Sequence, residues 1–253
     1  MCYIDGAEFI HKEAEFLETL MKKQYRNEWK YCCTNTELAA IAAKLDALLP
    51  KDEHTGNGGR YSVHSLYFDD IRNTCALSTE AGDASRFKYR IRYYDQDPSF
   101  LRLERKEKLD GGCHKDSCRL TQEEYAELFG GNMSPFLFDA DRPVLRRFAQ
   151  DALRRYFTPR VIVDYERIAY VEPIANVRIT MDYNISVSGP AEGFLTGDYT
   201  RIPLMKKNQH ILEVKFDEIL PAYIKQCLYD CQLRQSSFSK YYLGFEKLRR
   251  MQG

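Results

Sequence analysis

A run of alternating basic residues between positions 86 and 93 is the first feature that could do chemistry. The basic residues are Arg86, Lys88, Arg90 and Arg92, and apolar residues separate them. Successive side chains of a β-strand point to opposite faces, so the four cations would share one face. Like charges at this spacing repel one another unless an anion neutralises them. Guanidinium and ammonium groups in such a row favour a ligand that carries several phosphates.

Other segments repeat this division between a charged and an apolar face. The charged or polar faces hold Arg102, Glu104, Lys106 and Lys108, then Arg178, Thr180 and Asp182, then Glu213, Lys215 and Asp217. For any single strand, the simplest interpretation is a sheet with its charged face in water and its apolar face on helices. Recurrence along the chain instead favours a sheet closed into a barrel, with the charged face inside and helices outside.

The charge of such a barrel indicates its ligand. Cations confined in one lumen cost free energy unless phosphates or counter-ions neutralise them. Polyphosphate is a flexible chain of negative charges and suits a basic tunnel. A nucleic acid would need a wider groove with stacking aromatic residues on the charged face, and here the aromatic residues lie on the opposite face. We therefore expect a phosphate chain as ligand and no nucleic acid.

The strands and helices that position these residues are predicted from the spacing of apolar residues. Capping boxes at Thr34 and Thr121 and Pro143 in a first helical turn mark where helices begin. The predicted strands are 25–31, 61–68, 86–94, 100–108, 115–120, 160–171, 176–186 and 209–216. The predicted helices are 36–49, 122–129, 143–156, 221–233 and 237–250. Asp69 and Asp70 are interpreted as a turn. The fold class is therefore α+β: an eight-stranded antiparallel barrel over 25–253 with helices packed outside, preceded by a helical extension over 1–24.

Overall charge, the length of apolar runs, cysteine spacing and missing motifs exclude several classes of protein. The chain has 253 residues, and its 37 Lys and Arg balance its 37 Asp and Glu, so partners must be inferred from local charge. No apolar run is long enough to span a bilayer, and no secretory signal is expected, which predicts a cytoplasmic location. The eight cysteines lack metal-type spacing and are interpreted as reduced thiols. No glycine-rich phosphate loop occurs, which excludes a P-loop kinase.

An ordered set of short motifs runs along most of the chain. The set is Arg26-x-Glu28-x-Lys30, Ser65-Leu66-Tyr67-Phe68-Asp69, Lys88-x-Arg90-x-Arg92, Glu104-Arg105-Lys106, Arg167, Arg178, Glu213-x-Lys215 and Phe238-Ser239-Lys240-Tyr241. It resembles the catalytic domain of the vacuolar transporter chaperone (VTC) polyphosphate polymerases, within the triphosphate tunnel metalloenzyme superfamily. The resemblance covers roughly residues 25–245 and depends on the order of the motifs, since no single motif is specific.

The resemblance implies a polymerase that transfers the γ-phosphate of ATP to a growing polyphosphate chain. It implies that Arg90 and Arg92 bind the triphosphate and that Glu213 holds Mn²⁺ or Mg²⁺. Glu28 is the candidate for a second metal ligand. The further cations of the implied site are Lys30, Lys106, Lys115, Arg167, Arg178 and Lys240, with Lys240 at the tunnel mouth. Strand parity, meaning that alternate residues of a strand share one face, adds Arg86, Lys88 and Lys215 to the substrate-binding set.

One position departs from the superfamily pattern and leaves alternatives open. Arg26 replaces the first glutamate of the usual first-strand motif, which removes one potential metal ligand and adds a cation. This change favours polyanion binding over a two-metal hydrolase. The alternatives to a polymerase are a tripolyphosphatase or nucleoside triphosphatase on the same tunnel, and a polyphosphate-binding module without catalysis. The expected partners are ATP, polyphosphate and a membrane protein that receives the product.

Overall fold

The computed structural model describes residues 25–55, 59–190, 192–231 and 233–252, and the helix predicted within 1–24 lies outside them. The strands are β1 (Asn27–Thr34), β2 (Tyr61–Asp69), β3 (Ser85–Tyr94), β4 (Asp97–Leu109), β5 (Gly112–Leu120), β6 (Thr158–Glu172), β7 (Val177–Ser188), β8 (Ile202–Pro203) and β9 (Gln209–Phe216). The α-helices are α2 (Asn35–Asp46), α3 (Thr74–Ala81), α4 (Gln122–Phe129), α5 (Pro143–Arg155), α6 (Ala222–Tyr229) and α7 (Lys240–Gln252). Short 3₁₀ turns occupy Glu53–Thr55, Ser134–Phe136 and Glu192–Leu195.

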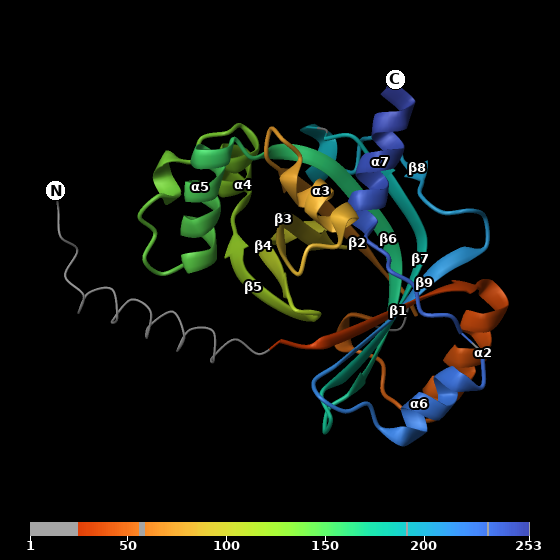
Figure 1. Ribbon diagram of the computed structural model, residues 1–253. Coiled ribbons are helices and arrows are strands. Elements are labelled where there is room, and N and C mark those ends of the chain that lie inside the picture. The colour runs from red at the N-terminus through yellow and green to blue at the C-terminus, as the bar shows by residue number, and fades with distance from the viewer. Residues whose placement is uncertain (1–24, 56–58, 191, 232, 253) are drawn as a thin grey trace, which may run out of the picture.

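All nine strands belong to one antiparallel sheet. Its order is β1-β9-β7-β6-β2-β3-β4-β5, and the short β8 pairs with β7 beside this path. Figure 1 shows the sheet curled on itself, with β1 and β5 brought towards each other. The predicted antiparallel barrel with outer helices is therefore confirmed, and β8 is an addition to the eight predicted strands.

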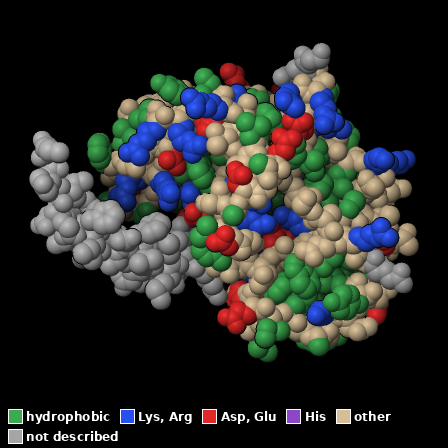
Figure 2. Space-filling view, viewed as in Figure 1, with side chains coloured by type: hydrophobic (Ala, Val, Ile, Leu, Met, Phe, Trp, Pro, Cys, Tyr) green, Lys and Arg blue, Asp and Glu red, His purple; other side chains and the backbone are tan. Residues whose placement is uncertain are grey.

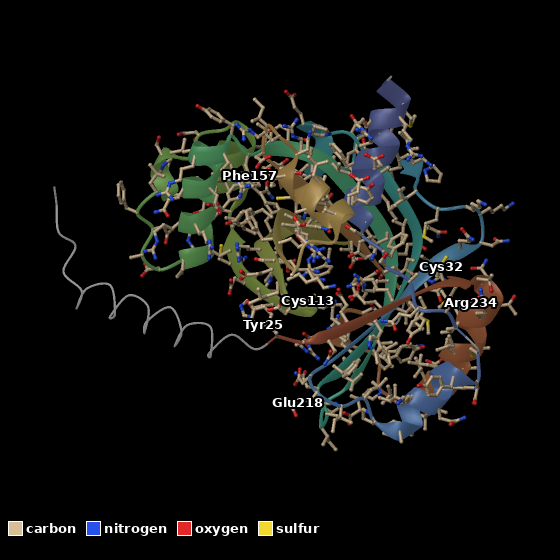
Figure 3. All side chains as sticks on the ribbon, viewed as in Figure 1. Tyr25, Cys32, Cys113, Phe157, Glu218 and Arg234 are labelled. Atoms are coloured by element: carbon tan, nitrogen blue, oxygen red, sulfur yellow. The ribbon has the colours of Figure 1, made fainter. Side chains whose placement is uncertain are left out.

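The two edges of the sheet meet at one bridge. The backbones of Arg26 and Cys113 exchange two hydrogen bonds, each 3.0 Å long. Tyr25 passes so close to Gly112 that a Cβ on this glycine would lie 2.7 Å from the Tyr25 Cβ. Figure 3 shows Tyr25 and Cys113 side by side where the edges come together. A glycine at 112 therefore permits the contact that closes the curled sheet.

The helices cover the outer, apolar face of the sheet. α3, α4 and α5 lie over β2, β3, β4 and β5, whereas α2 and α6 lie together on the side of β1 and β9 (Figure 1). One buried apolar cluster joins the first group through residues such as Leu66, Ile91 and Phe148. A second joins the other group through residues such as Leu38, Val214 and Ile224. The division of each strand into two faces thus has the expected sense, with the apolar face outside.

Both predicted capping boxes are present, at Thr34 and Thr121, but some element bounds were wrong. The predicted helices 36–49 and 221–233 end earlier, at Asp46 and Tyr229. Helix α3 was not predicted. It forms because Asp69 and Asp70 accept hydrogen bonds from backbone amides of residues 72–76 and so satisfy the donors of its first turn.

The start of α7 lies at one end of the tunnel. Just before it, the Ser236 amide donates to the Lys30 carbonyl on β1, over 2.8 Å. Within α7, the ring of Tyr241 stacks on Tyr67 of β2 with centroids 5.2 Å apart. The Tyr241 hydroxyl donates to Asp69 over 2.5 Å. The segment therefore crosses from β1 to β2 and fixes the first turn of α7 against the sheet.

Candidate functional site in the tunnel

The charged side chains meet on the inner face of the curled sheet. Figure 2 shows Lys and Arg side chains recessed in the middle of the visible face, with acidic groups beside them. The predicted site residues that form ion pairs there come from β1, β3, β4, β5, β6, β9 and α7. Three groups of these ion pairs, each built on buried carboxylates, organise the lumen.

Glu104 on β4 is the centre of the first group. Its carboxylate accepts from Arg90 over 2.7 Å, from Arg92 over 2.6 Å and from Lys115 over 3.0 Å. Burial by itself would raise the pKa of Glu104, but Arg90, Arg92 and Lys115 lower it far below its ordinary value. The structure therefore brings both predicted triphosphate-binding arginines together, already held by an internal anion.

Glu28 and Glu213 form the second group. Lys106 from β4 reaches Glu28 over 2.6 Å, and Lys30 lies 2.9 Å from Glu28 and 3.7 Å from Glu213. Lys215 pairs with Glu213 and lies 3.7 Å from Glu28. Burial and mutual repulsion would raise the pKa of Glu28, yet the three lysines lower it well below its usual range. The two carboxylates predicted as metal ligands are thus neighbours, and both are ionised.

Asp182 on β7 is the centre of the third group. Arg167 donates to both of its oxygens, over 2.6 and 2.8 Å, and Lys240 donates over 2.6 Å. Tyr165 lies beside both cations, with its ring centroid 5.0 Å from the Arg167 guanidinium carbon and 4.8 Å from the Lys240 nitrogen. Lys240 was expected at the tunnel mouth, and the structure shows its ammonium paired with the buried Asp182.

Lys88 differs from the cations of these three groups. No described carboxylate lies within ion-pair distance of its ammonium, which donates to the Ser239 hydroxyl over 2.8 Å and lies 5.7 Å from the Tyr241 ring centroid. Burial first, and then Lys106 and Lys30, lower the pKa of Lys88 to about 7. Near neutral pH, Lys88 is therefore partly deprotonated, and an anionic ligand beside it would favour the protonated, charged form.

Three other basic residues lie away from the clusters. Arg178 pairs with Asp52 and the Tyr61 hydroxyl, and Arg86 donates to a backbone carbonyl near the start of β3. Arg26 was interpreted as an extra cation for the ligand. Its guanidinium lies 2.8 Å from Asp217. Arg26 is thus paired with a protein carboxylate, as Arg90 and Arg92 are, and its part in ligand binding stays a prediction.

The tunnel offers a divalent cation only a few carboxylate ligands among the described residues. Among the described residues, no group of three or more His, Cys, Asp or Glu could hold a metal ion. Glu28 and Glu213 offer two ionised carboxylates, which Lys30 and Lys215 bridge. Mg²⁺ is commonly held by one or two carboxylates together with substrate phosphates. The residues therefore fit a metal ion that arrives with a phosphate ligand.

Sequence reasoning did not assign several groups that organise the tunnel. Glu104 and Asp182 were placed on charged faces but were given no role, although shared parity with the cations was a usable signal. Tyr67, whose hydroxyl accepts from Arg90 over 3.0 Å, and Ser239 were also missed. Both residues lie in the motifs that carry the family resemblance, but their hydroxyls follow no charge pattern that would indicate a role.

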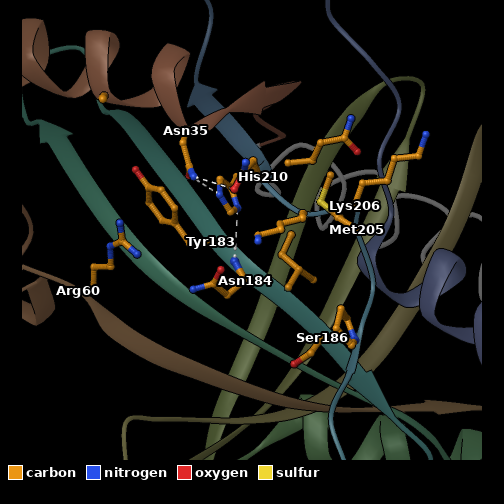
Figure 4. A pocket seen from close by; sticks show the side chains of 14 residues that line it. Asn35, Arg60, Tyr183, Asn184, Ser186, Met205, Lys206 and His210 are labelled. Atoms are coloured by element: carbon orange, nitrogen blue, oxygen red, sulfur yellow. Dashed lines mark hydrogen bonds between the residues drawn. The ribbon is translucent and has the colours of Figure 1, made fainter.

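A second cavity, of about 830 Å³, lies outside the tunnel. It opens beyond Asp182, where β7 leaves β9 and pairs with β8. Figure 4 shows His210 beside it, linked to Asn35 over 2.6 Å and to the backbone amide of Asn184 over 3.4 Å. None of the predicted site residues lines this cavity.

The inner face of the curled antiparallel sheet thus gathers cations round buried carboxylates. The VTC domain family matches residues 25–249. The chain belongs to the VTC domain family.

Three solved structures that are similar to this chain have low sequence identity to it. A Bacillus halodurans protein described provisionally as an adenylate cyclase is 12% identical, covers 86% of this chain and 95% of its own, and has a TM-score of 0.49. A Pyrococcus horikoshii protein is 14% identical over 86% of this chain and 98% of its own, with a TM-score of 0.46. The Mimivirus capping enzyme triphosphatase is 10% identical over 91% and 98%, with a TM-score of 0.38. No curated protein matches the chain.

None of the helices in the described residues has the length and apolar character of a membrane span.

The pH dependence of phosphate binding should report on Lys88. A bound phosphate raises the pKa of this lysine, so above a pH of about 7 each binding event should take up a proton. The affinity for tripolyphosphate should therefore fall as the pH rises, by at most about tenfold per pH unit for one proton. Titration calorimetry in buffers with different ionisation heats measures both quantities.

Lys88→Arg is the matched control, because it keeps a cation that does not lose its proton. The ionisation of the phosphate ligand itself is common to both proteins. The variant should show less proton uptake and a flatter pH profile than the wild type. Identical profiles would remove Lys88 from the linkage.

Proposed function

We propose that this chain is a metal-assisted phosphotransferase that lengthens polyphosphate with the γ-phosphate of ATP. The observation that carries the proposal is a tunnel in which cations from six strands (β1, β3, β4, β5, β6 and β9) converge on buried carboxylates. Membership in the VTC domain family supports it.

Phosphate binding would exchange one set of counter-ions for another. Arg90, Arg92 and Lys115 all contact Glu104. A single carboxylate cannot use every donor of these cations, and the remaining N–H groups are available to phosphate oxygens. The arginines would orient the triphosphate through paired hydrogen bonds, and Lys115 would add a mobile charge.

The second group of ion pairs is the proposed place of transfer. Glu28 and Glu213 would hold Mn²⁺ or Mg²⁺ together with phosphate oxygens, and the ion would neutralise charge on the transferring group. Lys30, Lys106 and Lys215 surround these carboxylates. Their ammonium groups would stabilise the negative charge that builds up on the non-bridging oxygens.

The transfer itself needs no protein nucleophile. A terminal oxygen of the acceptor chain forms a bond to the γ-phosphorus, and the bond to the β,γ-bridging oxygen breaks. The electron pair of that bond leaves with ADP. The protein would contribute position and charge, which account for most of the catalysis of phosphoryl transfer.

Product analysis tests the proposed activity. Purified protein incubated with ATP and Mn²⁺, with or without a short polyphosphate primer, should yield ADP and chains longer than the primer on a polyacrylamide gel. Release of inorganic phosphate without longer chains would replace the polymerase with a hydrolase. Binding of polyphosphate without any turnover would instead indicate a binding module.

Glu213→Gln should abolish turnover and leave polyphosphate binding largely intact. The substitution removes a metal-binding charge, whereas ground-state binding depends on many cations. We expect the rate of ADP formation to fall by about 100-fold or more, while the affinity for polyphosphate changes little. Initial rates and titration calorimetry measure the two effects separately.

Glu218→Gln provides the control, since Glu218 is exposed and follows the same strand. It should behave as the wild type in both assays. Wild-type turnover in Glu213→Gln would show that Glu213 is not a metal ligand.

A further inference from the structure

Two neighbouring groups on the tunnel wall have no hydrogen-bond partner among the described residues. They are the hydroxyl of Ser65 and the Nε of Arg92, and both atoms are buried. Ser65 has 0% of its surface exposed and Arg92 has 7%. The two residues face each other across the β2–β3 ladder. Buried polar groups in proteins are rarely left unpaired, so this pair needs an explanation.

Strand parity places both groups on the inner face. Tyr67, two residues after Ser65, directs its hydroxyl to Arg90 in the lumen. Side chains two residues apart on a strand share a face. The intervening positions point outward, since His64 stacks on Tyr93 at a centroid distance of 4.7 Å. The Ser65 hydroxyl therefore faces the same space as the first group of ion pairs.

The chemistry of the two groups defines what can bind them. The Arg92 Nε carries a hydrogen and can only donate, and a serine hydroxyl can donate as well. The other end of the guanidinium already donates to Glu104 over 2.6 Å. A metal ion would be repelled by the positive charge of Arg92. An oxygen that accepts from both groups, and carries negative charge, suits the position best.

We propose that Ser65 and the Nε of Arg92 form a binding position for one phosphate oxygen of the polyanion, separate from Glu28 and Glu213. The inference rests on the proposed function for the identity of its ligand. Arg90 and Lys115, which share Glu104 with Arg92, supply further positive charge around this phosphate. Ser65 is thereby a substrate-binding residue, and it fixes the position of the chain along β2 and β3.

The substitution Ser65→Ala separates this role from a structural one. In the ligand-free protein the substitution removes an unpaired buried hydroxyl, so the unfolding temperature should stay the same or rise. The affinity for tripolyphosphate, measured by calorimetry without ATP or metal, should fall about tenfold or more, because a hydrogen bond to a charged group is lost. The two readouts thus move independently.

Ser62→Ala is the matched control, since it makes the same change on the same strand but on the opposite face. It should leave the affinity for tripolyphosphate unchanged. Arg92→Lys is a second variant that keeps the positive charge and loses the Nε donor, and it should weaken binding as well. If Ser65→Ala instead proves too unstable to assay, the hydroxyl has a structural role and the inference is overturned.

The outcomes distinguish the inference from the proposed function. Unchanged affinity in Ser65→Ala, with normal chain synthesis in the wild type, would overturn the inference alone. A hydroxyl that only holds a water molecule would give this result. Reduced affinity in a protein that makes no polyphosphate would support the phosphate position and contradict the polymerase. A wild type that does not bind tripolyphosphate would overturn both.

Discussion

The mutual repulsion of cations confined in one lumen is the constraint on which the rest of the structure depends. Such charges are tolerable only if opposite charges stand between them. Glu28, Glu104 and Asp182 each contact two or more cations. Some of these contacts also join parts that are distant in the sheet or the sequence. Glu28 links β1 to β4 across the closure, and Asp182 links β7 to α7.

The same constraint explains how a tunnel can be folded without its ligand and still bind one. Each buried carboxylate stabilises the cations in the ligand-free state, and a phosphate chain can take over their unused donors. Three groups have no protein carboxylate as partner among the described residues: the Lys88 ammonium, the Ser65 hydroxyl and the Nε of Arg92. Under the proposed function, they are the places where a bound phosphate would meet groups that no protein carboxylate satisfies. Binding affinity and fold stability are therefore coupled through one set of charges.

Strand parity was enough to predict the barrel and most of its inner face. The alternation of Lys88, Arg90 and Arg92 with aromatic residues has one physical meaning in a closed sheet, and the structure confirms it. Strand parity predicts the face on which a side chain lies, but it does not predict which group the charged end of that side chain contacts. Lys240 bonds to Asp182 inside the tunnel, and Arg26 pairs with Asp217 at the rim. Both contacts depend on tertiary neighbours that local pattern does not contain.

The local sequence pattern also failed to predict a helix that is stabilised by capping hydrogen bonds more than by a periodic apolar face. Helix α3 has a weak apolar stripe, and the carboxylates of Asp69 and Asp70 stabilise its first turn from outside the helix. The two-residue strand β8 is too short for any alternation to show. The roles of Glu104 and Asp182 depend on which cations surround them, so only the register of the assembled sheet reveals them.

The most direct test of this electrostatic account is the stability of Glu104→Gln with and without tripolyphosphate. The variant leaves Arg90, Arg92 and Lys115 without their shared anion. Without ligand, its free energy of unfolding should fall by about 3–5 kcal/mol, the usual cost of breaking a buried ion pair. Added tripolyphosphate should then stabilise the variant more than it stabilises the wild type, because phosphate replaces the missing charge. Unchanged stability without ligand, or a smaller gain with it, would contradict the account.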